Sequence, residues 1–268
     1  MSYIFDYQEL TKAITAFRNK YPHIPVFCIG KSLQDRNLYA IKLGRGSKRI
    51  FFNAAHHGME WLTAKLLMQF AEDLASGAYG AHELLDGCTL YLVPMVNPDG
   101  VQIAAGGKRW QANARGVDLN HNYDALWHLS KQSEREAGIE GPGPTRFSGA
   151  YPESEPESRA VADFTRQNAF DLVLAFHSQG EVIYWDFCGF APDKSFAYAK
   201  RFETVSPYRM DVPDGIASYG GYKDWFIRAF KRPGFTIEVG LGENPLPIED
   251  FPQVYTRTLP LMLEALKL

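Results

Sequence analysis

The chain has 268 residues, of which 46% are hydrophobic and 22% charged, as is ordinary for a folded globular protein. Its formal net charge of −3 gives no electrostatic case for nucleic acid or an anionic membrane surface as a partner. The first residues lack a basic segment followed by an apolar one, so we expect no signal peptide and a cytoplasmic location. No stretch is long and apolar enough to predict a transmembrane helix.

Hydrophobic periodicity predicts alternating strands and helices in the first part of the chain. In order, a helix, three strands, a helix and a strand are expected over residues 6–20, 25–30, 37–43, 48–55, 61–76 and 89–95. Asp6 is the expected N-cap of the first helix. Residues 96–152 are rich in Asn, Gly and Pro and read as a long irregular stretch, which in a compact domain is usually functional.

The second part continues the same alternation. Ser154 has the spacing of a capping box and is expected to begin a helix that ends near residue 168. The elements expected after it are a strand, a strand, two helices, a strand and a C-terminal helix, over residues 171–176, 182–187, 193–204, 222–231, 234–240 and from 249 onward. The pattern predicts one α/β domain over residues 1–268, with a mixed sheet covered by helices on both faces.

Four polar points lie in or just past apolar strands: the His57–Glu60 segment, the Asn97–Gly100 segment, His177 and Glu238. In open α/β sheets, ligands bind in the crevice at the carboxyl ends of the strands. Points that are far apart in sequence can therefore converge on one site.

The residue types at these points suit a catalytic zinc site, which takes three protein ligands and leaves one position for water. His57 and Glu60 offer two ligands in one loop, and His177 offers the third; His56 has no carboxylate three residues on. Taken alone, His57 and Glu60 are better explained by a polar loop that caps the following helix, and His177 by a hydrogen-bonded histidine at a strand end. Glu238 is harder to explain in that way, because a carboxylate inside an apolar strand needs a cation, a metal or a catalytic role.

Five ordered motifs together resemble the zinc carboxypeptidase family. They are His57-Gly58-Met59-Glu60-Trp61, Asn97-Pro98-Asp99-Gly100, Gly116-Val117-Asp118-Leu119-Asn120, His177-Ser178 and Thr236-Ile237-Glu238. The resemblance covers roughly residues 5–265. It implies a single domain with a mixed, mostly parallel sheet of about eight strands, and one Zn²⁺ held by His57, Glu60 and His177.

More narrowly, three segments are similar to the bacterial γ-D-glutamyl-L-diamino acid endopeptidases. The segments are residues 110–122, 177–180 and 220–225. This similarity implies hydrolysis of a γ-D-glutamyl-meso-diaminopimelate bond in small, acidic cell-wall peptides. A general metallocarboxypeptidase, an N-acyl-amino-acid deacylase and, less favoured, a non-catalytic zinc-containing peptide-binding module remain the alternatives.

The resemblance also implies catalytic roles for single residues. Glu238 is expected to be the general base that activates water and then protonates the leaving amine. An arginine is expected to stabilise the oxyanion, and here Arg115 is preferred and Arg109 is the alternative. The family's own arginine falls at Gln111, which leaves this assignment open.

Substrate-binding roles follow from the same alignment. Asn120 matches an asparagine that binds the terminal carboxylate, and His121 stands where the family has an arginine. Because an imidazole lacks the bidentate grip of a guanidinium, strict selection for a free C-terminus is in doubt. Lys223 is expected to favour an acidic side chain after the scissile bond. The family's pocket tyrosine falls at Ile216, with Tyr219 and Tyr222 as candidate replacements and core packing as the other reading; the list of expected substrate-binding residues is Asn120, His121 and Lys223.

Overall fold

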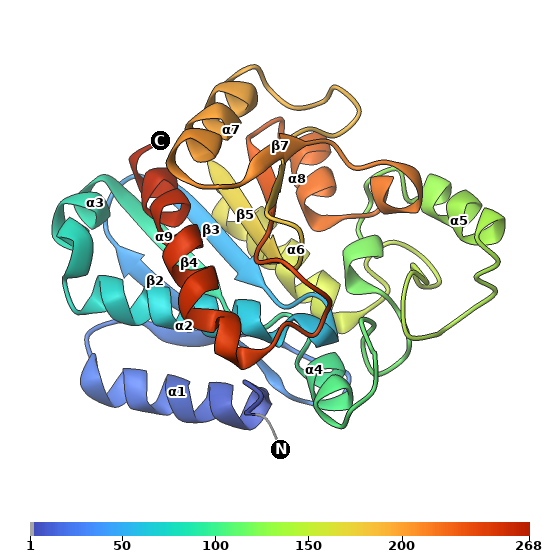
Figure 1. The fold of residues 1–268 in the computed structure, drawn as a ribbon, viewed down its shortest axis with the longest axis horizontal. Coiled ribbons are helices and arrows are strands. Elements are labelled where there is room, and N and C mark those ends of the chain that lie inside the picture. Colours follow the sequence, from blue (N-terminus) through green and yellow to red (C-terminus); the bar gives the residue numbers. More distant parts are fainter. Residues whose placement is uncertain (1–2) are drawn as a thin grey trace.

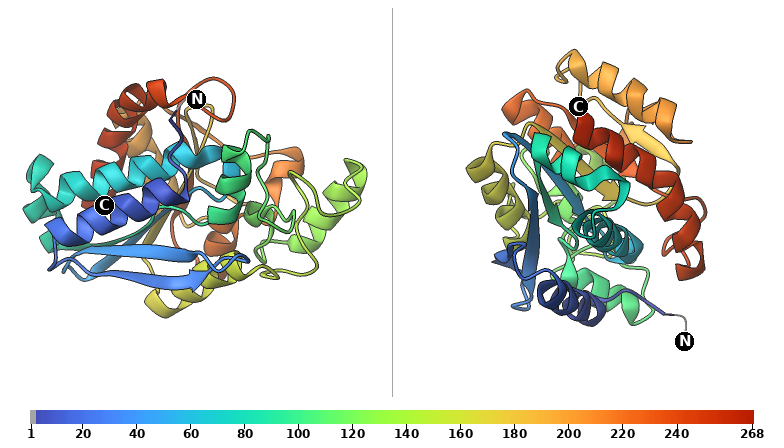
Figure 2. Two further views of the ribbon diagram at one scale, coloured as in Figure 1. Left: turned by 90° about the horizontal axis from the view of Figure 1, so that it is seen from below. Right: turned by 90° about the vertical axis from the view of Figure 1, so that its left-hand side faces the viewer.

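A computed structural model describes residues 3–268, apart from the side chains of Ile216 and Ser218. The chain forms one eight-stranded sheet between two layers of helices (Figures 1 and 2). The strand order is β1-β2-β4-β3-β5-β8-β6-β7. The strands are β1 Val26–Lys31, β2 Asn37–Gly44, β3 Lys48–Ala54, β4 Cys88–Val93, β5 Leu172–His177, β6 Val182–Tyr184, β7 Arg209–Asp211 and β8 Gly234–Glu238.

The four strands β4, β3, β5 and β8 run parallel to one another in the middle of the sheet. The pairs β1·β2, β2·β4 and β6·β8 are antiparallel, whereas β6·β7 is parallel. This arrangement confirms the α/β class and the mixed, mostly parallel eight-stranded sheet expected from the sequence.

The helices cover both faces of the sheet. They are α1 Tyr7–Lys20, α2 Trp61–Ala75, α3 Ala81–Gly87, α4 Pro98–Ala105, α5 Trp127–Glu136, α6 Pro156–Asn168, α7 Lys194–Val205, α8 Tyr222–Phe230 and α9 Phe251–Lys267. Side chains of α1, α2, α7 and α9 join one hydrophobic core, and those of α6 and α8 join the other. No helix among the described residues has the length and apolar character needed to span a membrane.

Alternation along the central strands feeds these two cores. In β3, Ile50 and Phe52 pack into the core of α1 and α2, whereas Phe51 between them packs with α6 and α8. Because successive side chains of a strand point to opposite faces, an apolar run is needed where helices cover both sides. The central strands are therefore packed on both faces, and the loops at their carboxyl ends begin from this packed core.

The stretch 96–152 is less irregular than the sequence suggested, since it contains α4, α5 and the short 3₁₀ helix η3 Leu119–His121. Asn97 caps α4 by accepting a hydrogen bond from the amide of Gly100, and Pro98 occupies the first turn. Proline at that position fits a helix start, because the first-turn amides have no partner within the helix. The Asn and Pro that indicated a loop are here helix-start signals.

Two further details differ from the expected pattern. Ser154 does not cap α6: Glu155 is the N-cap residue, and the Ser154 hydroxyl donates to the Glu155 side chain at 2.9 Å. Strand β6 stops at Tyr184, and β7 and α3 were not predicted.

Candidate active site

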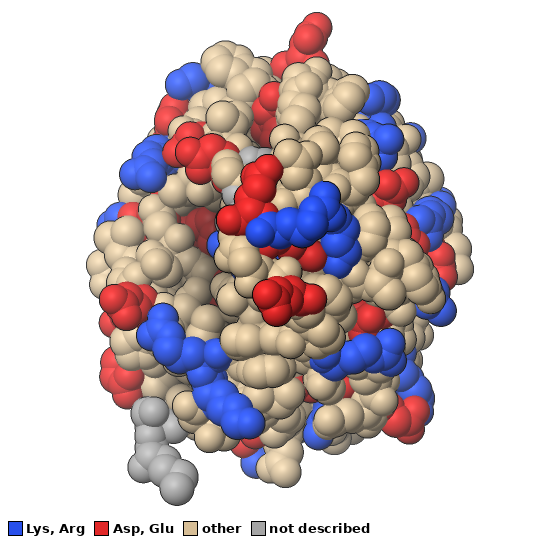
Figure 3. Space-filling view, turned by 90° about the vertical axis from the view of Figure 1, so that its right-hand side faces the viewer, with Lys and Arg blue, Asp and Glu red and all other residues tan. Residues whose placement is uncertain are grey.

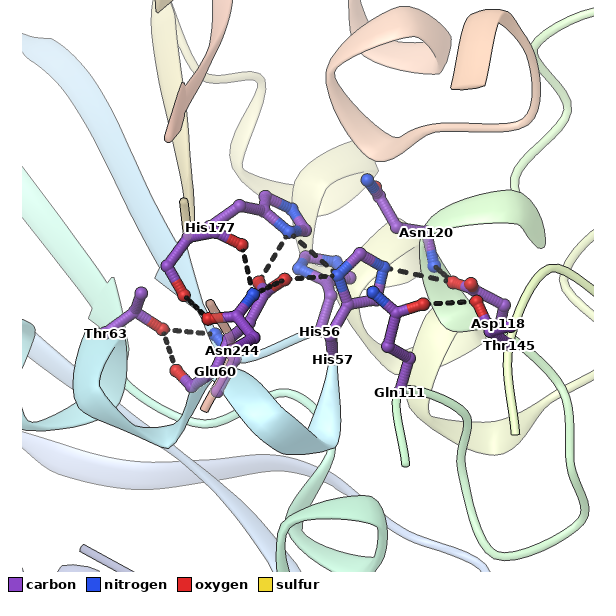
Figure 4. Close-up of polar contacts among 12 residues, drawn as sticks. His56, His57, Glu60, Thr63, Gln111, Asp118, Asn120, Thr145, His177 and Asn244 are labelled. Atoms are coloured by element: carbon purple, nitrogen blue, oxygen red, sulfur yellow. Dashed lines mark hydrogen bonds and ion pairs between the residues drawn. The ribbon is translucent and has the colours of Figure 1, made fainter. Parts of the chain in front are cut away.

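Three side chains from the carboxyl ends of β3 and β5 converge on one point. His57 and Glu60 come from the loop after β3 and the 3₁₀ helix η1 Gly58–Glu60, and His177 is the last residue of β5. Their potential ligand atoms all lie within 4.8 Å of one another. The Nδ1 atom of His57 is 2.8 Å from Glu60 Oε1, and the Nδ1 atom of His177 is 3.0 Å from Glu60 Oε2 (Figure 4).

This cluster fits a divalent metal on its own geometry. The Nδ1 atoms of His57 and His177 lie 3.3 Å apart and both face the carboxylate of Glu60. Two imidazole lone pairs that close together repel unless a proton or a cation lies between them. Two histidines and one glutamate are also a ligand set that catalytic zinc sites use. These residues are therefore the ones that would hold the ion.

Asp118 fixes the far side of the His57 ring. Its Oδ1 accepts a hydrogen bond from His57 Nε2 at 3.1 Å. Figure 4 shows Asp118 on the side of the His57 ring that faces away from Glu60. Burial alone would raise the pKa of Asp118, but the charge and the hydrogen bond of His57 outweigh it and hold the pKa well below its usual value. A carboxylate behind a histidine ligand orients the ring and makes it a better donor to a metal.

Glu60 is held from two directions. The hydroxyl of Thr63 donates to the backbone carbonyl of Glu60 at 2.6 Å, and the side chain of Asn244 approaches Oε1 at 3.4 Å. Asn244 itself is fixed by Ser178, whose hydroxyl donates to Oδ1 at 2.7 Å and whose carbonyl accepts from Nδ2 at 2.6 Å. Although burial opposes ionisation, His57 and His177 lower the pKa of Glu60 to about 2.

Two of the sequence motifs meet through their glycines. A Cβ atom at Gly58 would lie 2.4 Å from the carbonyl oxygen of Gly100, so only glycine allows this close approach. Asn97 completes the junction: its side-chain amide donates to the carbonyls of His56, Gln111 and Ala112 at 2.9, 3.1 and 3.0 Å. The NPDG motif therefore acts as a buried clamp on the loop that carries His57.

Glu238 is paired with His177 in the register of β5 and β8, which places the two side by side. It is half-buried and lines the same cavity as His57 and Glu60. Burial and the nearby charge of Glu60 raise its pKa to about 8, whereas His57 and Arg146 oppose the rise. A carboxyl group whose pKa lies close to neutral pH, beside a possible metal site, can exchange a proton with substrate or water.

A cavity of about 310 Å³ lies over these residues. It opens on a hollowed face in which acidic side chains are visible (Figure 3). Besides His57, Glu60 and Glu238, its walls include Gln111, Asn120, His121, Arg146, Tyr184, Lys223 and Asp224. The structure thus brings His57, Glu60, the expected base and the three expected substrate-binding residues to one cavity. The third expected ligand, His177, is buried directly behind Glu60.

The arginines expected at the oxyanion are not in this cavity. The side chain of Arg115 is 56% exposed and approaches Glu155 at 3.6 Å, and that of Arg109 is 71% exposed and approaches Glu243 at 3.7 Å. The assignment of Arg115, and its alternative Arg109, is therefore wrong. The physical reason is a turn at residues 113–116, closed by the Gly116 amide, which donates to the Asn113 carbonyl at 3.1 Å. Arg115 lies in this turn and its side chain approaches Glu155, whereas Gln111 lines the cavity.

The cavity instead contains Arg146, which sequence reasoning missed. Its Nη1 atom lies 3.2 Å from His121 Nε2, and its amide donates to Asp118 Oδ2 at 3.0 Å. Arg146 lies in a Gly- and Pro-rich loop with φ of +68°, where no periodic pattern marks it. Asn244 was missed for the same reason. Only the density of turn residues around both could have indicated a functional loop.

Lys223 lines the cavity but does not stand free. It is 2% exposed, forms an ion pair with the carboxylate of Asp224, and donates to the carbonyl of Asp186 at 2.6 Å. Burial raises the pKa of Asp224, and the charge of Lys223 acts against that rise. The cavity wall at this point therefore carries a buried pair of opposite charges, not the lone cation that the sequence predicted.

The candidate tyrosines do not share one role. Tyr222 is fully buried, and its hydroxyl lies 3.0 Å from that of Thr165, so it belongs to the core. Tyr219 contributes its backbone carbonyl to His121 Nδ1 at 3.0 Å. The side chain of Ile216 lies outside the described residues. His56 is buried, with Nε2 at 3.0 Å from the Tyr123 hydroxyl, as befits a packing residue behind the site.

Comparison with known sequences gives evidence on the family of this chain that is independent of the geometry. The sequence profile of the family described as zinc carboxypeptidase matches residues 10–260. The γ-D-glutamyl-L-diamino acid endopeptidase 1 of Lysinibacillus sphaericus is 37% identical over 293 residues, covering 98% of this chain and 72% of that protein. The mast cell carboxypeptidase A of Rattus norvegicus is 30% identical over 173 residues, covering 58% of this chain and 40% of that protein.

Solved structures show the same fold. Bovine thrombin-activatable fibrinolysis inhibitor, in complex with tick carboxypeptidase inhibitor, superimposes with a TM-score of 0.80 over 99% of this chain and 97% of that chain. The sequence identity is 21%, so this likeness concerns the architecture alone.

Proposed function

Because this chain belongs to the zinc carboxypeptidase family, we propose that it hydrolyses the amide bond between a γ-linked D-glutamyl residue and a diamino acid in cell-wall peptides. The chain is a zinc metallopeptidase by family. The observation that carries the substrate class is its 37% identity, along nearly its whole length, to a relative named for that bond. The preferred diamino acid in this proposal is meso-diaminopimelate.

The proposed chemistry divides between the metal and the chain. Zinc held by His57, Glu60 and His177 would lower the pKa of a water molecule and polarise the scissile carbonyl. Glu238 takes a proton from the attacking water and delivers it to the leaving amine. Asp118 keeps the His57 ring in place throughout, through the bond to Nε2 at 3.1 Å.

The paired charges of Lys223 and Asp224 support a diamino acid as the group after the scissile bond. Both side chains line the cavity and both are buried. A side chain that ends in an ammonium and a carboxylate can oppose Asp224 with its cation and Lys223 with its anion. An uncharged side chain would leave the buried pair without that complement.

The test is hydrolysis of L-Ala-γ-D-Glu-meso-diaminopimelate, with and without a C-terminal D-Ala, followed by mass spectrometry. We expect release of the diaminopimelate-containing product, and loss of that release when a chelator removes zinc. Cleavage of the longer peptide would show that a free carboxylate next to the scissile residue is not required.

Two controls make the result interpretable. The α-linked isomer L-Ala-α-D-Glu-meso-diaminopimelate should be resistant, because the proposal concerns the γ-linkage. The variant Glu238→Gln should bind zinc at full occupancy and lose at least about a hundredfold in kcat, since it removes the general base. Cleavage of ordinary α-peptides in place of the γ-linked ones would leave a zinc peptidase and discard the cell-wall substrate.

A further inference from the structure

Among the described residues that line the cavity, two side chains carry a permanent positive charge, Arg146 and Lys223. Lys223 is neutralised by its ion pair with Asp224. Arg146 makes no ion pair with any carboxylate in the part of the chain that the structure describes, and its guanidinium hydrogen-bonds to the imidazole of His121. Its charge acts on Asp118 and Glu238 only from beyond ion-pair distance. A half-buried arginine that lines the cavity and forms no ion pair can bind an anionic group of the substrate there.

The hydrogen bonds of His121 define how this guanidinium is held. Its Nδ1 lies 3.0 Å from the carbonyl oxygen of Tyr219, which can only accept, so Nδ1 carries the proton. Burial lowers the pKa of His121 and keeps the ring neutral, so Nε2 is an acceptor. Nε2 then accepts from Arg146 Nη1 at 3.2 Å. His121 is therefore occupied at both nitrogens and orients Arg146 without being a ligand itself.

The backbone of Arg146 is fixed as firmly as its side chain. Its amide donates to Asp118 Oδ2 at 3.0 Å, and the carbonyl of Phe147 accepts from the Asp118 amide at 2.8 Å. Asp118 is also the partner of His57 Nε2. The same buried carboxylate thus sets the position of a histidine of the metal cluster and of the loop that presents the guanidinium.

A second donor lies next to this charge. The Oδ1 atom of Asn120 accepts the amide of Tyr222 at 3.0 Å, which identifies the side-chain oxygen and leaves Nδ2 as a donor at the cavity wall. A guanidinium and an amide NH₂ that line one cavity match the two oxygens of a carboxylate, which accepts only.

We propose that Arg146 binds a carboxylate of the substrate, that Asn120 assists it, and that His121 is the positioning residue for the guanidinium. The proposal rests on the proposed function for its substrate. His121 stands where the family has an arginine. In this proposal the loop that carries Arg146 supplies that positive charge instead. A γ-D-glutamyl-diamino acid peptide offers two candidate groups: the α-carboxylate of the diamino acid and the free α-carboxylate of the γ-linked glutamate.

The experiment compares L-Ala-γ-D-Glu-meso-diaminopimelate with two amides of it, one blocked at each of those α-carboxylates. With the wild-type protein, the amide of the carboxylate that Arg146 binds should lose about 10- to 100-fold in kcat/KM, mainly through KM. In Arg146→Gln, the unblocked peptide should fall to the same level, and blocking should then change little. Blocking the other carboxylate should act equally on both proteins, which identifies the bound group.

The matched control is Arg115→Gln, which removes an arginine outside the cavity and should leave all three peptides unchanged. If Arg146→Gln lowers kcat for the blocked and unblocked peptides by the same factor, the guanidinium stabilises the oxyanion or the fold, and the proposal is overturned. Zinc content and circular dichroism report folding. Should Arg146→Gln fail to fold, Arg146→Asn replaces it, because asparagine tolerates the positive φ at this position.

The role of His121 is tested with the ratio of kcat/KM for the unblocked peptide to kcat/KM for the blocked peptide. His121→Gln keeps an acceptor for Arg146 and should retain part of the discrimination, whereas His121→Phe should lose it as Arg146→Gln does. A purely structural role would lower activity on every peptide and leave the ratio intact.

Failure of the proposed function has a different signature. If no γ-linked peptide is cut, the same comparison is made by calorimetry, with the tripeptide binding to Glu238→Gln and to the double variant with Arg146→Gln. It is repeated with an N-acetylated α-dipeptide and its C-terminal amide as substrates of the wild-type protein. Discrimination by Arg146 in either assay would keep the carboxylate site; equal binding and equal cleavage in both would remove it.

Discussion

The Oδ1 atom of Asp118 accepts a hydrogen bond from His57 Nε2 at 3.1 Å, while Oδ2 accepts the amide of Arg146 at 3.0 Å. One buried carboxylate therefore links the metal cluster to the substrate side of the cavity. Its negative charge also makes the His57 ring a stronger donor at Nδ1.

Asp118→Asn should weaken zinc binding. The amide keeps the size of the side chain but removes the charge, so the apparent Kd for zinc should rise about 10- to 100-fold. Competition with a chromophoric chelator measures this. Asp163→Asn, at a 54% exposed position on α6, is the control and should bind zinc as the wild type does. An unchanged Kd in Asp118→Asn would contradict the role of the carboxylate.

Zinc binding should release protons at neutral pH. Burial lowers the pKa of His57, but Glu60 and Asp118 outweigh it and raise the pKa well above its usual value, so the metal-free protein holds a proton there. Zinc requires an unprotonated ring, so zinc affinity should rise with pH across the neutral range. Calorimetry in buffers of different ionisation enthalpy gives the number of protons released. A binding enthalpy that is the same in every buffer would count against this reading.

Glu238→Gln should stabilise the metal-free protein at high pH. Burial and the charge of Glu60 raise the folded pKa from 4.5 to about 8, so between these values the folded protein holds a proton that the unfolded chain has released. Wild-type stability therefore falls as pH rises through this window, and glutamine removes that dependence. Calorimetry with a chelator should show a Tm difference at pH 8 that vanishes near pH 4.

The control for that measurement is Glu243→Gln, which changes a side chain that is 86% exposed. Its Tm should follow the wild type at both pH values. A gain in Tm for Glu238→Gln that is independent of pH would mean that packing, and not ionisation, separates the two proteins.

Asn97→Asp should be more destabilising than Asn97→Ala, although aspartate has nearly the same shape. The side-chain amide donates to three carbonyl oxygens, and aspartate would face them with a buried negative charge. Asn97→Ala should lose about 2–4 kcal/mol, because it leaves buried acceptors unpaired. Urea unfolding gives the free energy of unfolding of both variants. An equal loss in the two would contradict the expected effect of the buried aspartate charge.

The convergence of His57, Glu60, His177 and Glu238 was predictable because these residues lie at or just past the ends of strands. An apolar run predicts a buried strand, and a single polar residue at its end or inside it, such as His177 or Glu238, stands out as a candidate functional residue. Residues such as Arg146 and Asn244 gave no such signal, since they lie in loops whose path depends on partners far away in sequence. Asn244 depends on Ser178, and Arg146 depends on Asp118 and His121.

The errors have the same origin. Arg115 was chosen because it stands near the expected position in the sequence, yet a turn in the chain directs it to Glu155. Lys223 was correctly expected at the cavity, but its neighbour Asp224 was not recognised as a charge partner, because adjacent residues on a helix do not usually face each other. Short-range contacts of this kind are decided by the packing around them.

Strand β8 lies between β5 and β6, both of which precede it in the chain. His57, Glu60 and His177 all precede β8 in the chain and are therefore synthesised before it. Glu238, at the end of β8, enters only when that strand inserts into the gap. The proposed general base is therefore the last of these four side chains to be synthesised, and it reaches the site only with the strand that completes the middle of the sheet.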